Sequence, residues 1–465
     1  MPTMRKGAVR FFLPVVLAFL AVTIAAHPAR DDMSEFAQTP PMGWNSWDAW
    51  GMNINEQQFR DTVTYFHNHL QRYGWQYVVI DEGWFAQHPE NPAGHQDYTL
   101  SDRGLYLPAV NRFPSAAAGK GFRPLADWVH AQGLRFGIHI IHGIPREAVE
   151  RNLPIPGSHF HAADAADTSN TCSWNSDNYG LKSNKAAQDY YDAVADMYAK
   201  WGVDYLKVDC ISQPYQADEI HMLSHALAQS GRPIVLSLSP GPTPLSAADD
   251  VVRNAQLWRI SDDVWDLWSK PATAPPFPQA LKNQFALIAA WQPYSGPGHW
   301  PDADMLPIGY LGPTPGWGDS RHSRLTVDEM RTMVTLWSIS RSPLFIGANL
   351  LKMDAPTEDA LTDPEVLDVD QYSENNRPVI RKPNLVVWMA SAPQHAGDYV
   401  AVFNLADTPQ DVNLSWDDLG FPFGKRPIRD LWKREELGRV DHLEVTLPPH
   451  SSALYNVEHP DGALQ

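Results

Sequence analysis

The stretch Tyr205-Leu-Lys-Val-Asp-Cys210 is a short apolar run that ends in an acidic residue, and it follows an amphipathic segment over 185–201. In that segment apolar side chains recur at helical spacing, from Ala187 to Trp201. An amphipathic helix packs one face against a sheet, and a continuous apolar run is typical of a strand buried on both faces. The stretch therefore predicts a helix over 185–201, then a buried parallel strand, with the carboxylate of Asp209 at its carboxyl end.

The same alternation of short apolar runs and longer helical segments extends from Gln38 to about Asp370. Eight strand starts are predicted, near residues 42, 78, 136, 206, 235, 258, 294 and 344. Eight βα units over roughly 330 residues fit a closed (β/α)8 TIM barrel of the α/β class. An open doubly wound sheet is the alternative, although no Gly-x-Gly-x-x-Gly motif follows the first strand. The predicted catalytic domain spans residues 38–371.

After residue 371 the pattern changes to short alternating runs separated by Gly, Pro, Asp and Asn, without helical periodicity. Strands are predicted at 385–388, 399–403, 412–414 and 443–447, and residues 373–378 are predicted to be a linker. Short strands at this spacing favour a small antiparallel β-sandwich. We therefore expect a C-terminal domain over residues 378–465.

The first residues follow the order of a secretory signal peptide: basic side chains at 5, 6 and 10, an apolar run over 11–25, and small residues at 25 and 26. The apolar run is shorter than the ~20 residues that a bilayer requires, which favours a signal peptide over 1–26 and disfavours a stable membrane anchor. The expected location is therefore secreted or periplasmic. A formal charge of −18 disfavours a nucleic-acid partner.

Acidic residues end several of the predicted strands, where chemistry gathers in a barrel of this kind. One acid in such a place is an ordinary helix cap, but acids after four of the eight strands are harder to explain in that way. Carboxylates beside abundant tryptophan in an exported chain favour glycoside hydrolysis, in which two carboxyl groups flank the scissile bond. The acids are Asp81, Glu82, Asp209, Asp262, Asp263, Asp302 and Asp304.

Five sequence motifs follow one another along the predicted barrel. They are Thr39-Pro-Pro-Met-Gly-Trp-Asn-Ser-Trp47, Val79-Ile-Asp-Glu-Gly-Trp84, Trp201-Gly-Val-Asp-Tyr-Leu-Lys-Val-Asp-Cys210, Trp258-Arg-Ile-Ser-Asp-Asp-Val264 and Asp302-Ala-Asp-Met-Leu306. Together with the segment 325–350, they make residues 38–371 resemble glycoside hydrolase family 27, the α-galactosidase or melibiase family. The resemblance implies a retaining exo-α-galactosidase that removes terminal α-linked D-galactose from oligo- or polysaccharides, without a metal or cofactor.

The resemblance also implies roles for single residues. Asp209 matches the family's nucleophile and Asp263 its general acid/base, which implies a double displacement with net retention. Lys207 lies on the same face of the strand as Asp209 and favours its anionic form. Cys172 and Cys210 match a family disulfide, with two unpaired thiols as the alternative. The substrate-binding residues implied in this way are Trp47, Asp81, Glu82, His139, Lys207, Ser239, Arg259 and Asp304.

Three of these positions depart from the common family pattern. Asp81 and Glu82 match an acidic pair that grips the 4- and 6-hydroxyls of the sugar, but galactosidases of the family usually have Asp in place of Glu82. The additional methylene moves the carboxylate roughly 1.5 Å further into the pocket, where it crowds the hydroxymethyl group. A β-L-arabinopyranosidase is therefore an alternative. His139 replaces a common Tyr, and Ser239 replaces a Glu near the 2-hydroxyl, so an α-N-acetylgalactosaminidase is another alternative.

Two further alternatives belong to different classes of protein. A sugar-binding barrel without catalysis is disfavoured because both predicted catalytic acids are present. Metal-dependent hydrolysis through the histidines at 139, 142, 159 and 161 is disfavoured because no His-Glu-x-x-His or His-x-x-Glu-His spacing occurs. The expected partner is therefore a carbohydrate substrate.

Overall fold

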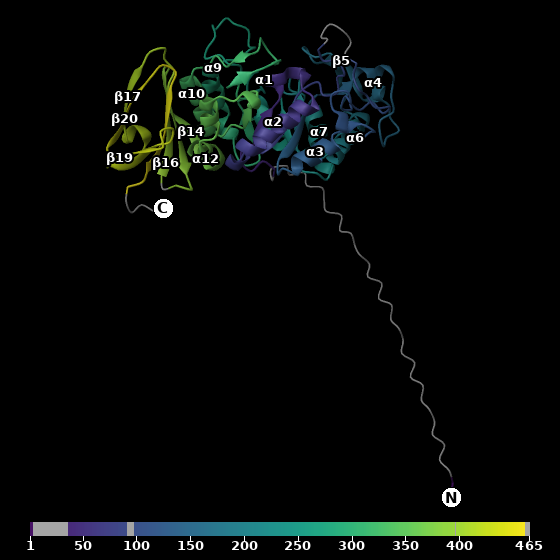
Figure 1. Cartoon of the computed structure of the whole chain (residues 1–465), viewed down its shortest axis with the longest axis horizontal. Coiled ribbons are helices and arrows are strands. Elements are labelled where there is room, and N and C mark those ends of the chain that lie inside the picture. Colours follow the sequence, from purple (N-terminus) through teal and green to yellow (C-terminus); the bar gives the residue numbers. More distant parts are fainter. Residues whose placement is uncertain (3–35, 91–96, 396, 461–465) are drawn as a thin grey trace.

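The computed structural model of the chain describes residues 1–2, 36–90, 97–395 and 397–460. The signal peptide predicted over 1–26 lies outside these residues, apart from its first two positions. Within the described ranges, no helix is long and apolar enough to cross a membrane. The described chain forms a barrel and an antiparallel sheet domain, which lies at one end of the molecule and is coloured yellow in Figure 1.

The barrel is built on a sheet of parallel strands, eight in the described chain, in the order β10-β9-β8-β7-β3-β2-β1-β13. A parallel bridge between Leu306, after β10, and Ile346, in β13, joins the two ends of this sheet. The predicted closed barrel is therefore confirmed. Its strands are β1 (Met42–Asn45), β2 (Tyr77–Ile80), β3 (Arg135–Ile141), β7 (Tyr205–Asp209), β8 (Val235–Leu238), β9 (Leu257–Arg259), β10 (Trp300–Asp302) and β13 (Leu344–Ile346).

The long helices cover the outer face of the barrel, and short helices such as α1, α4 and α5 lie in its loops. The helix predicted over 185–201 is confirmed as α6 (Lys185–Trp201), which the Asn184 side chain caps and Gly202 ends in a left-handed conformation. The other helices of the barrel are α1 (Trp47–Trp50), α2 (Glu56–His69), α3 (Arg123–His130), α4 (Arg146–Glu150), α5 (Ala162–Ala165), α7 (Ala217–Gln229), α8 (Ala248–Asn254), α9 (Leu281–Trp291), α10 (Val327–Ser340), α11 (Ala355–Leu361) and α12 (Pro364–Tyr372).

One strand position was predicted incorrectly. The strand expected near Tyr294 is a 3-10 helix, η6 (Gln292–Tyr294), and the barrel strand β10 begins at Trp300. Proline near the start of a helical turn costs nothing, because its missing N–H would have no partner there. The apolar and aromatic run around Pro293 therefore continues the turn after α9 and does not extend into a strand.

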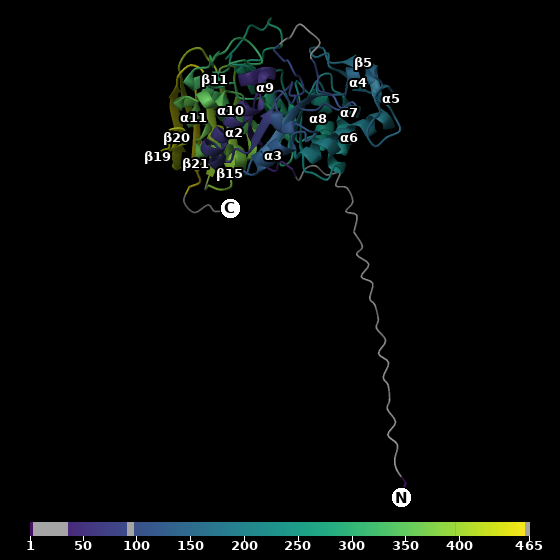
Figure 2. The same cartoon turned by 45° about the vertical axis from the view of Figure 1, so that its right-hand side comes forward.

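Two smaller sheets lie in the loops of the barrel. The insertion between β3 and β7 forms a three-stranded sheet of β4 (Ile144–Pro145), β6 (Asn178–Leu181) and β5 (Ala166–Thr171). The loop after β10 contains the hairpin of β11 (Tyr310–Leu311) and β12 (Arg321–His322). Figures 1 and 2 both place β5 and α4 at the end of the molecule opposite the yellow sheet domain.

The predicted antiparallel sandwich is confirmed. A six-stranded sheet in the order β14-β15-β16-β21-β18-β19 faces the pair β17 and β20, with Val402, Leu414 and Trp416 in the core between them. The expected linker over 373–378 is wrong, because β14 begins at Glu374 and pairs with β15. The strands are β14 (Glu374–Arg381), β15 (Leu385–Ala392), β16 (Gly397–Asn404), β17 (Gln410–Ser415), β18 (Arg426–Asp430), β19 (Glu435–Val440), β20 (His442–Leu447) and β21 (Ser452–Glu458).

The hydrophobic core of the barrel continues into the second domain. Phe285 in α9 and Phe403 in β16 meet edge to face with ring centroids 5.1 Å apart. The indole of Trp432 donates a 2.8 Å hydrogen bond to the hydroxyl of Thr335 in α10. Figure 1 shows α10 and α12 beside the strands of this domain. The sheet domain is thus packed against the barrel through apolar surface.

Candidate active site

Asp209 is the last residue of β7, and the groups around its carboxylate favour the ionised form. The Nε2 atom of His139 lies 3.3 Å from its Oδ2 atom. Burial alone would raise the pKa of Asp209, but Lys207, His139 and the Ser239 hydroxyl outweigh burial and hold that pKa well below its usual value. A carboxylate in this environment is anionic at neutral pH, as a nucleophile must be.

Lys207 connects β7, the strand that ends in Asp209, to the neighbouring acidic pair Asp81 and Glu82. Its Nζ atom lies 2.9 Å from Oδ2 of Asp81, which directly follows β2. The same oxygen accepts a 2.6 Å hydrogen bond from the side-chain amide of Asn45, at the end of β1. Burial opposes ionisation of Asp81, but the charge of Lys207 lowers its pKa below the usual value. Asp81 and Asp209 therefore share one buried cation.

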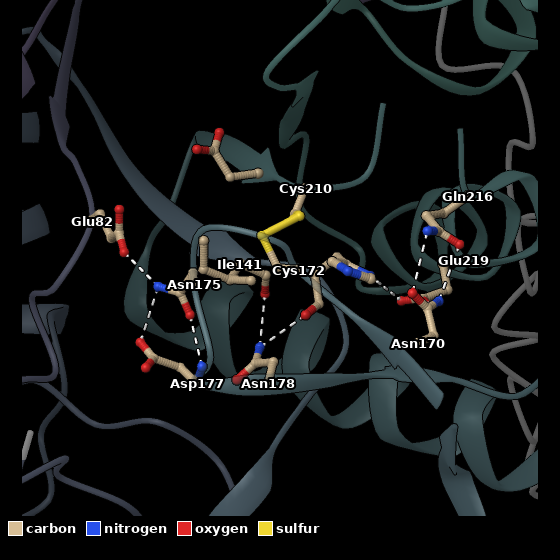
Figure 3. The surroundings of a disulfide bond; sticks show 12 residues. Glu82, Ile141, Asn170, Cys172, Asn175, Asp177, Asn178, Cys210, Gln216 and Glu219 are labelled. Atoms are coloured by element: carbon tan, nitrogen blue, oxygen red, sulfur yellow. Dashed lines mark hydrogen bonds and ion pairs between the residues drawn. A yellow bond between two sulfur atoms is a disulfide. The ribbon is translucent and has the colours of Figure 1, made fainter. Parts of the chain in front are cut away.

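Glu82 is held from the other side of the site. The side-chain amide of Asn175 donates a 2.6 Å hydrogen bond to Oε1 of Glu82. The same amide reaches Asp177 at 3.2 Å, and Figure 3 shows Asn175 between the two carboxylates. Burial raises the pKa of Glu82 to about 7, so this side chain is partly protonated at neutral pH.

The loop that carries Asn175 is attached to the end of β7. Cys172 and Cys210 form a disulfide with a Cα–Cα distance of 5.7 Å, which confirms the predicted pairing. Cys210 directly follows Asp209 in the sequence. Asn178 adds hydrogen bonds of 3.0 and 2.9 Å to the carbonyls of Ile141 and His142, at the end of β3 (Figure 3). The loop is thus held at Cys172 on one side of Asn175 and at Asn178 on the other.

Asp263 follows β9 and is the more accessible of the two predicted catalytic acids, with a side chain 35% exposed. The buried guanidinium of Arg259 lies 3.1 Å from Oδ1 of Asp263 and 2.7 Å from Oδ2 of Asp304. Oδ2 of Asp304 also accepts a 2.6 Å hydrogen bond from the backbone of Val264. Arg259 and Asp304 together fix the segment that carries Asp263.

Trp47 lies at the start of α1, and its half-buried ring faces the loop after β10. The backbone N–H of Gly316 donates a 3.0 Å hydrogen bond to the carbonyl of Trp47. A Cβ atom at Gly316 would stand 2.1 Å from the indole, so the glycine backbone lies directly on the ring. The ring is therefore fixed in orientation on the carboxyl-end face of the barrel.

The structure thus brings most of the predicted residues together. Ion pairs join Asp81 to Lys207 and Asp209 to His139, and the charge of Lys207 also acts on Asp209, so these four residues form one cluster. The ion pairs of Arg259 with Asp263 and Asp304 form a second cluster. The two clusters interact electrostatically, because the charge of Asp263 raises the pKa of Lys207.

Sequence reasoning missed Asn45, Asn175 and Asp48. Asn45 lies inside the first family motif, and Asn175 lies three residues after Cys172, so both had a positional signal. Burial, with the charges of Asp304 and Asp263, raises the pKa of Asp48 well above its usual value. Asp48 is therefore a buried acid next to the site whose charged form is disfavoured.

The four histidines of the metal alternative have separate partners. His139 contacts Asp209, and His142 lies 3.1 Å from Glu219. The ring of His159 packs on Phe160, and His161 precedes α5. Within the described residues, no group of three or more His, Cys, Asp or Glu side chains is arranged to hold a metal ion.

Known proteins resemble this chain over nearly its whole length. The family model described as alpha galactosidase A matches residues 179–372, and that of the alpha galactosidase C-terminal beta sandwich domain matches residues 382–457. An α-galactosidase of Cyamopsis tetragonoloba is 27% identical over 427 residues, covering 90% of this chain and 86% of that enzyme. An α-N-acetylgalactosaminidase of Gallus gallus is 27% identical over 444 residues, covering 90% and 93%.

A solved structure is more similar still. The family 27 β-L-arabinopyranosidase of Geobacillus stearothermophilus is 43% identical, with a TM-score of 0.87, over 93% of this chain and 99% of that chain. A variant of that enzyme was solved in complex with arabinose. The shared barrel, sandwich domain and sequence lead to one conclusion: the chain is a glycoside hydrolase and belongs to family 27, the family of the α-galactosidases.

Proposed function

We propose that the enzyme is a retaining exo-glycosidase that cleaves terminal β-L-arabinopyranosides in preference to α-D-galactosides. The two sugars share the configuration of the ring, and the arabinopyranoside lacks the hydroxymethyl group of galactose. The observation that carries this preference is the fixed, buried carboxyl group of Glu82 at the position expected to meet that hydroxymethyl group.

Glu82 has little freedom to make room for a larger sugar. Its Oε1 atom is held at 2.6 Å by Asn175, which the disulfide loop holds in turn. Compared with Asp, the side chain extends about 1.5 Å further, the length of one C–C bond. A misplaced group of this size in a sugar pocket costs about 1–3 kcal/mol, or roughly 10- to 200-fold in kcat/KM. The 43% identity with a β-L-arabinopyranosidase supports the same preference.

The proposed reaction is a double displacement. A carboxylate oxygen of Asp209 attacks the anomeric carbon, and the electron pair of the broken C–O bond stays on the leaving oxygen. Asp263 gives its proton to that oxygen. A water molecule then returns a proton to Asp263 as its oxygen attacks the anomeric carbon, which releases Asp209. The low pKa of Asp209 and the greater exposure of Asp263 support these two roles.

An α-galactosidase is the second candidate. The α-galactosidase relatives support it, as does the acid retained at Asp81, which is expected to bind a 4-hydroxyl that both sugars carry in the same orientation. The small side chain of Ser239 is compatible with an N-acetyl group at C2.

We also propose that residues 1–26 are a signal peptide and that the enzyme is secreted or periplasmic.

The test is a comparison of kcat/KM for p-nitrophenyl β-L-arabinopyranoside, α-D-galactopyranoside and α-N-acetylgalactosaminide under one set of conditions. We expect the arabinoside to be hydrolysed at least tenfold faster than the other two. A galactoside that is hydrolysed as fast as the arabinoside, or faster, would overturn the proposed preference and favour the assignment as an α-galactosidase.

A further inference from the structure

An aromatic surface lies beside the predicted acid/base. Phe277, which is 41% exposed, meets the half-buried Trp317 edge to face with ring centroids 6.1 Å apart. Trp317 in turn lies 5.3 Å from Trp265, two residues after Asp263. These rings come from the loops after β9 and β10, at the carboxyl-end face of the barrel, where the catalytic groups lie. The bordering elements α9 and β11 are labelled in Figure 2.

The loop that presents Phe277 is tied directly to the acid/base. The backbone N–H of Gln279 donates a 2.7 Å hydrogen bond to the carbonyl of Asp263. The Nζ atom of Lys270 donates to the carbonyls of Pro275 and Pro278, each at 2.6 Å. These contacts hold the backbone on both sides of the exposed Phe277, and ordering a surface loop in this way costs conformational entropy.

The loop after β10, which carries Trp317, is also held in place by side-chain contacts. Arg321 forms a bidentate pair with the buried carboxylate of Asp266, at 2.9 and 2.6 Å. Its guanidinium also lies 5.3 Å from the ring of Trp317. Next to Trp317, Gly316 lies on the ring of Trp47, which the family resemblance implies is a substrate-binding residue. Trp317 therefore lies between a residue that contacts Trp47 and the ring of Trp265 in the loop of the acid/base.

We propose that Phe277 and Trp317 form a binding site for the sugar ring of the leaving group. This inference rests on the proposed role of Asp263, because an acid that protonates the glycosidic oxygen places the leaving group on its own side of the bond. An exposed aromatic ring packs well against the apolar face of a pyranose. Binding energy from this second ring is available to lower the barrier of the reaction, so the enzyme favours oligosaccharides over glycosides with a small leaving group.

The test compares two substrates with the same terminal sugar, β-L-arabinopyranosyl fluoride and 6-O-β-L-arabinopyranosyl-D-glucose, in Phe277→Leu. The fluoride has no ring to occupy the site and needs no proton from Asp263. We expect kcat/KM for the disaccharide to fall about five- to tenfold, and kcat/KM for the fluoride to stay within twofold of wild type. Phe277→Tyr, which keeps the ring, should retain the disaccharide activity. Phe423→Leu, at an 87% exposed phenylalanine of the sandwich domain, is the matched control.

Equal losses on both substrates, or an unchanged rate on the disaccharide, would overturn the leaving-group site while the proposed function stands. A wild-type enzyme that cleaves neither compound but cleaves the α-galactosyl counterparts would overturn the sugar preference. The same pair of measurements on α-galactosyl fluoride and melibiose would then decide the leaving-group site. A wild type inactive on all four compounds would overturn the proposed function and this site with it.

Discussion

Replacing Lys207 with Met tests the electrostatics of the site. Its Nζ atom is 2.9 Å from Asp81, and at an effective dielectric constant of about 20 the attraction is about 6 kcal/mol before desolvation. Removing one partner of a buried ion pair lowers the free energy of unfolding by about 3–5 kcal/mol. Because Lys207 also holds down the pKa of Asp209, its removal should raise that pKa.

The lowered pKa values of Asp81 and Asp209 determine how pH affects both the activity and the stability of the Lys207→Met variant. Asp209 acts as a carboxylate, so a raised pKa moves the acidic limb of the kcat/KM profile to higher pH in Lys207→Met. Asp81 and Asp209 have lowered folded-state pKa values, so their contribution to stability is complete above their usual pKa near 4 and is lost as pH falls below it. The stability difference between wild type and variant should therefore be largest at neutral pH.

The assays are urea unfolding at pH 7 and pH 3, and kcat/KM for an aryl arabinopyranoside between pH 4 and 9. Lys207→Arg, which keeps the charge, is the control and should keep the acidic limb closer to its wild-type position. An acidic limb at the same pH in Lys207→Met as in wild type would refute the reasoning, as would equal stability at pH 7.

Three further predictions concern specificity and stability. Glu82→Asp should raise the ratio of galactoside to arabinopyranoside kcat/KM by about tenfold or more, measured on the aryl glycosides, and an unchanged ratio would count against Glu82 as the selector. The double variant Cys172→Ser/Cys210→Ser should lose about 4 kcal/mol in urea unfolding, because the disulfide closes a loop with a sequence separation of 38; a loss below about 1 kcal/mol would contradict the loop-closure account. Phe403→Ala should lower the free energy of unfolding by about 3–5 kcal/mol and lower the midpoint temperature of one calorimetric transition. Two separate transitions would show instead that the barrel and the sandwich unfold independently.

The barrel was predictable because its signal is local and repeated. A strand such as β8, buried along its whole length, requires a continuous apolar run, and that run can be read without knowing its neighbours. The signal failed where strands are short or polar. Strand β10 has three residues, one of them Pro301, and β14 is a sheet edge with mostly polar, partly exposed side chains. β10 is buried but too short to show a run of apolar residues, and β14 is too exposed to require one.

The site was predictable only in part, for a related reason. Acids such as Asp209 and Asp263 could be found because barrel chemistry lies at strand ends. The contact of Asn175 with Glu82 joins residues 93 positions apart, across the disulfide loop. No periodicity in the sequence encodes such a contact. The aromatic surface at Phe277 and Trp317 was missed because it depends on how two loops pack against each other.

The most direct test of the central claim is to trap and map the covalent glycosyl-enzyme. A 2-fluorinated β-L-arabinopyranoside with a good leaving group slows the second displacement, and peptide mass spectrometry then locates the attached sugar. The account predicts a label on Asp209 in wild type and none in a folded, inactive Asp209→Asn variant. A label on another residue, or a first product of inverted anomeric configuration by NMR, would contradict it.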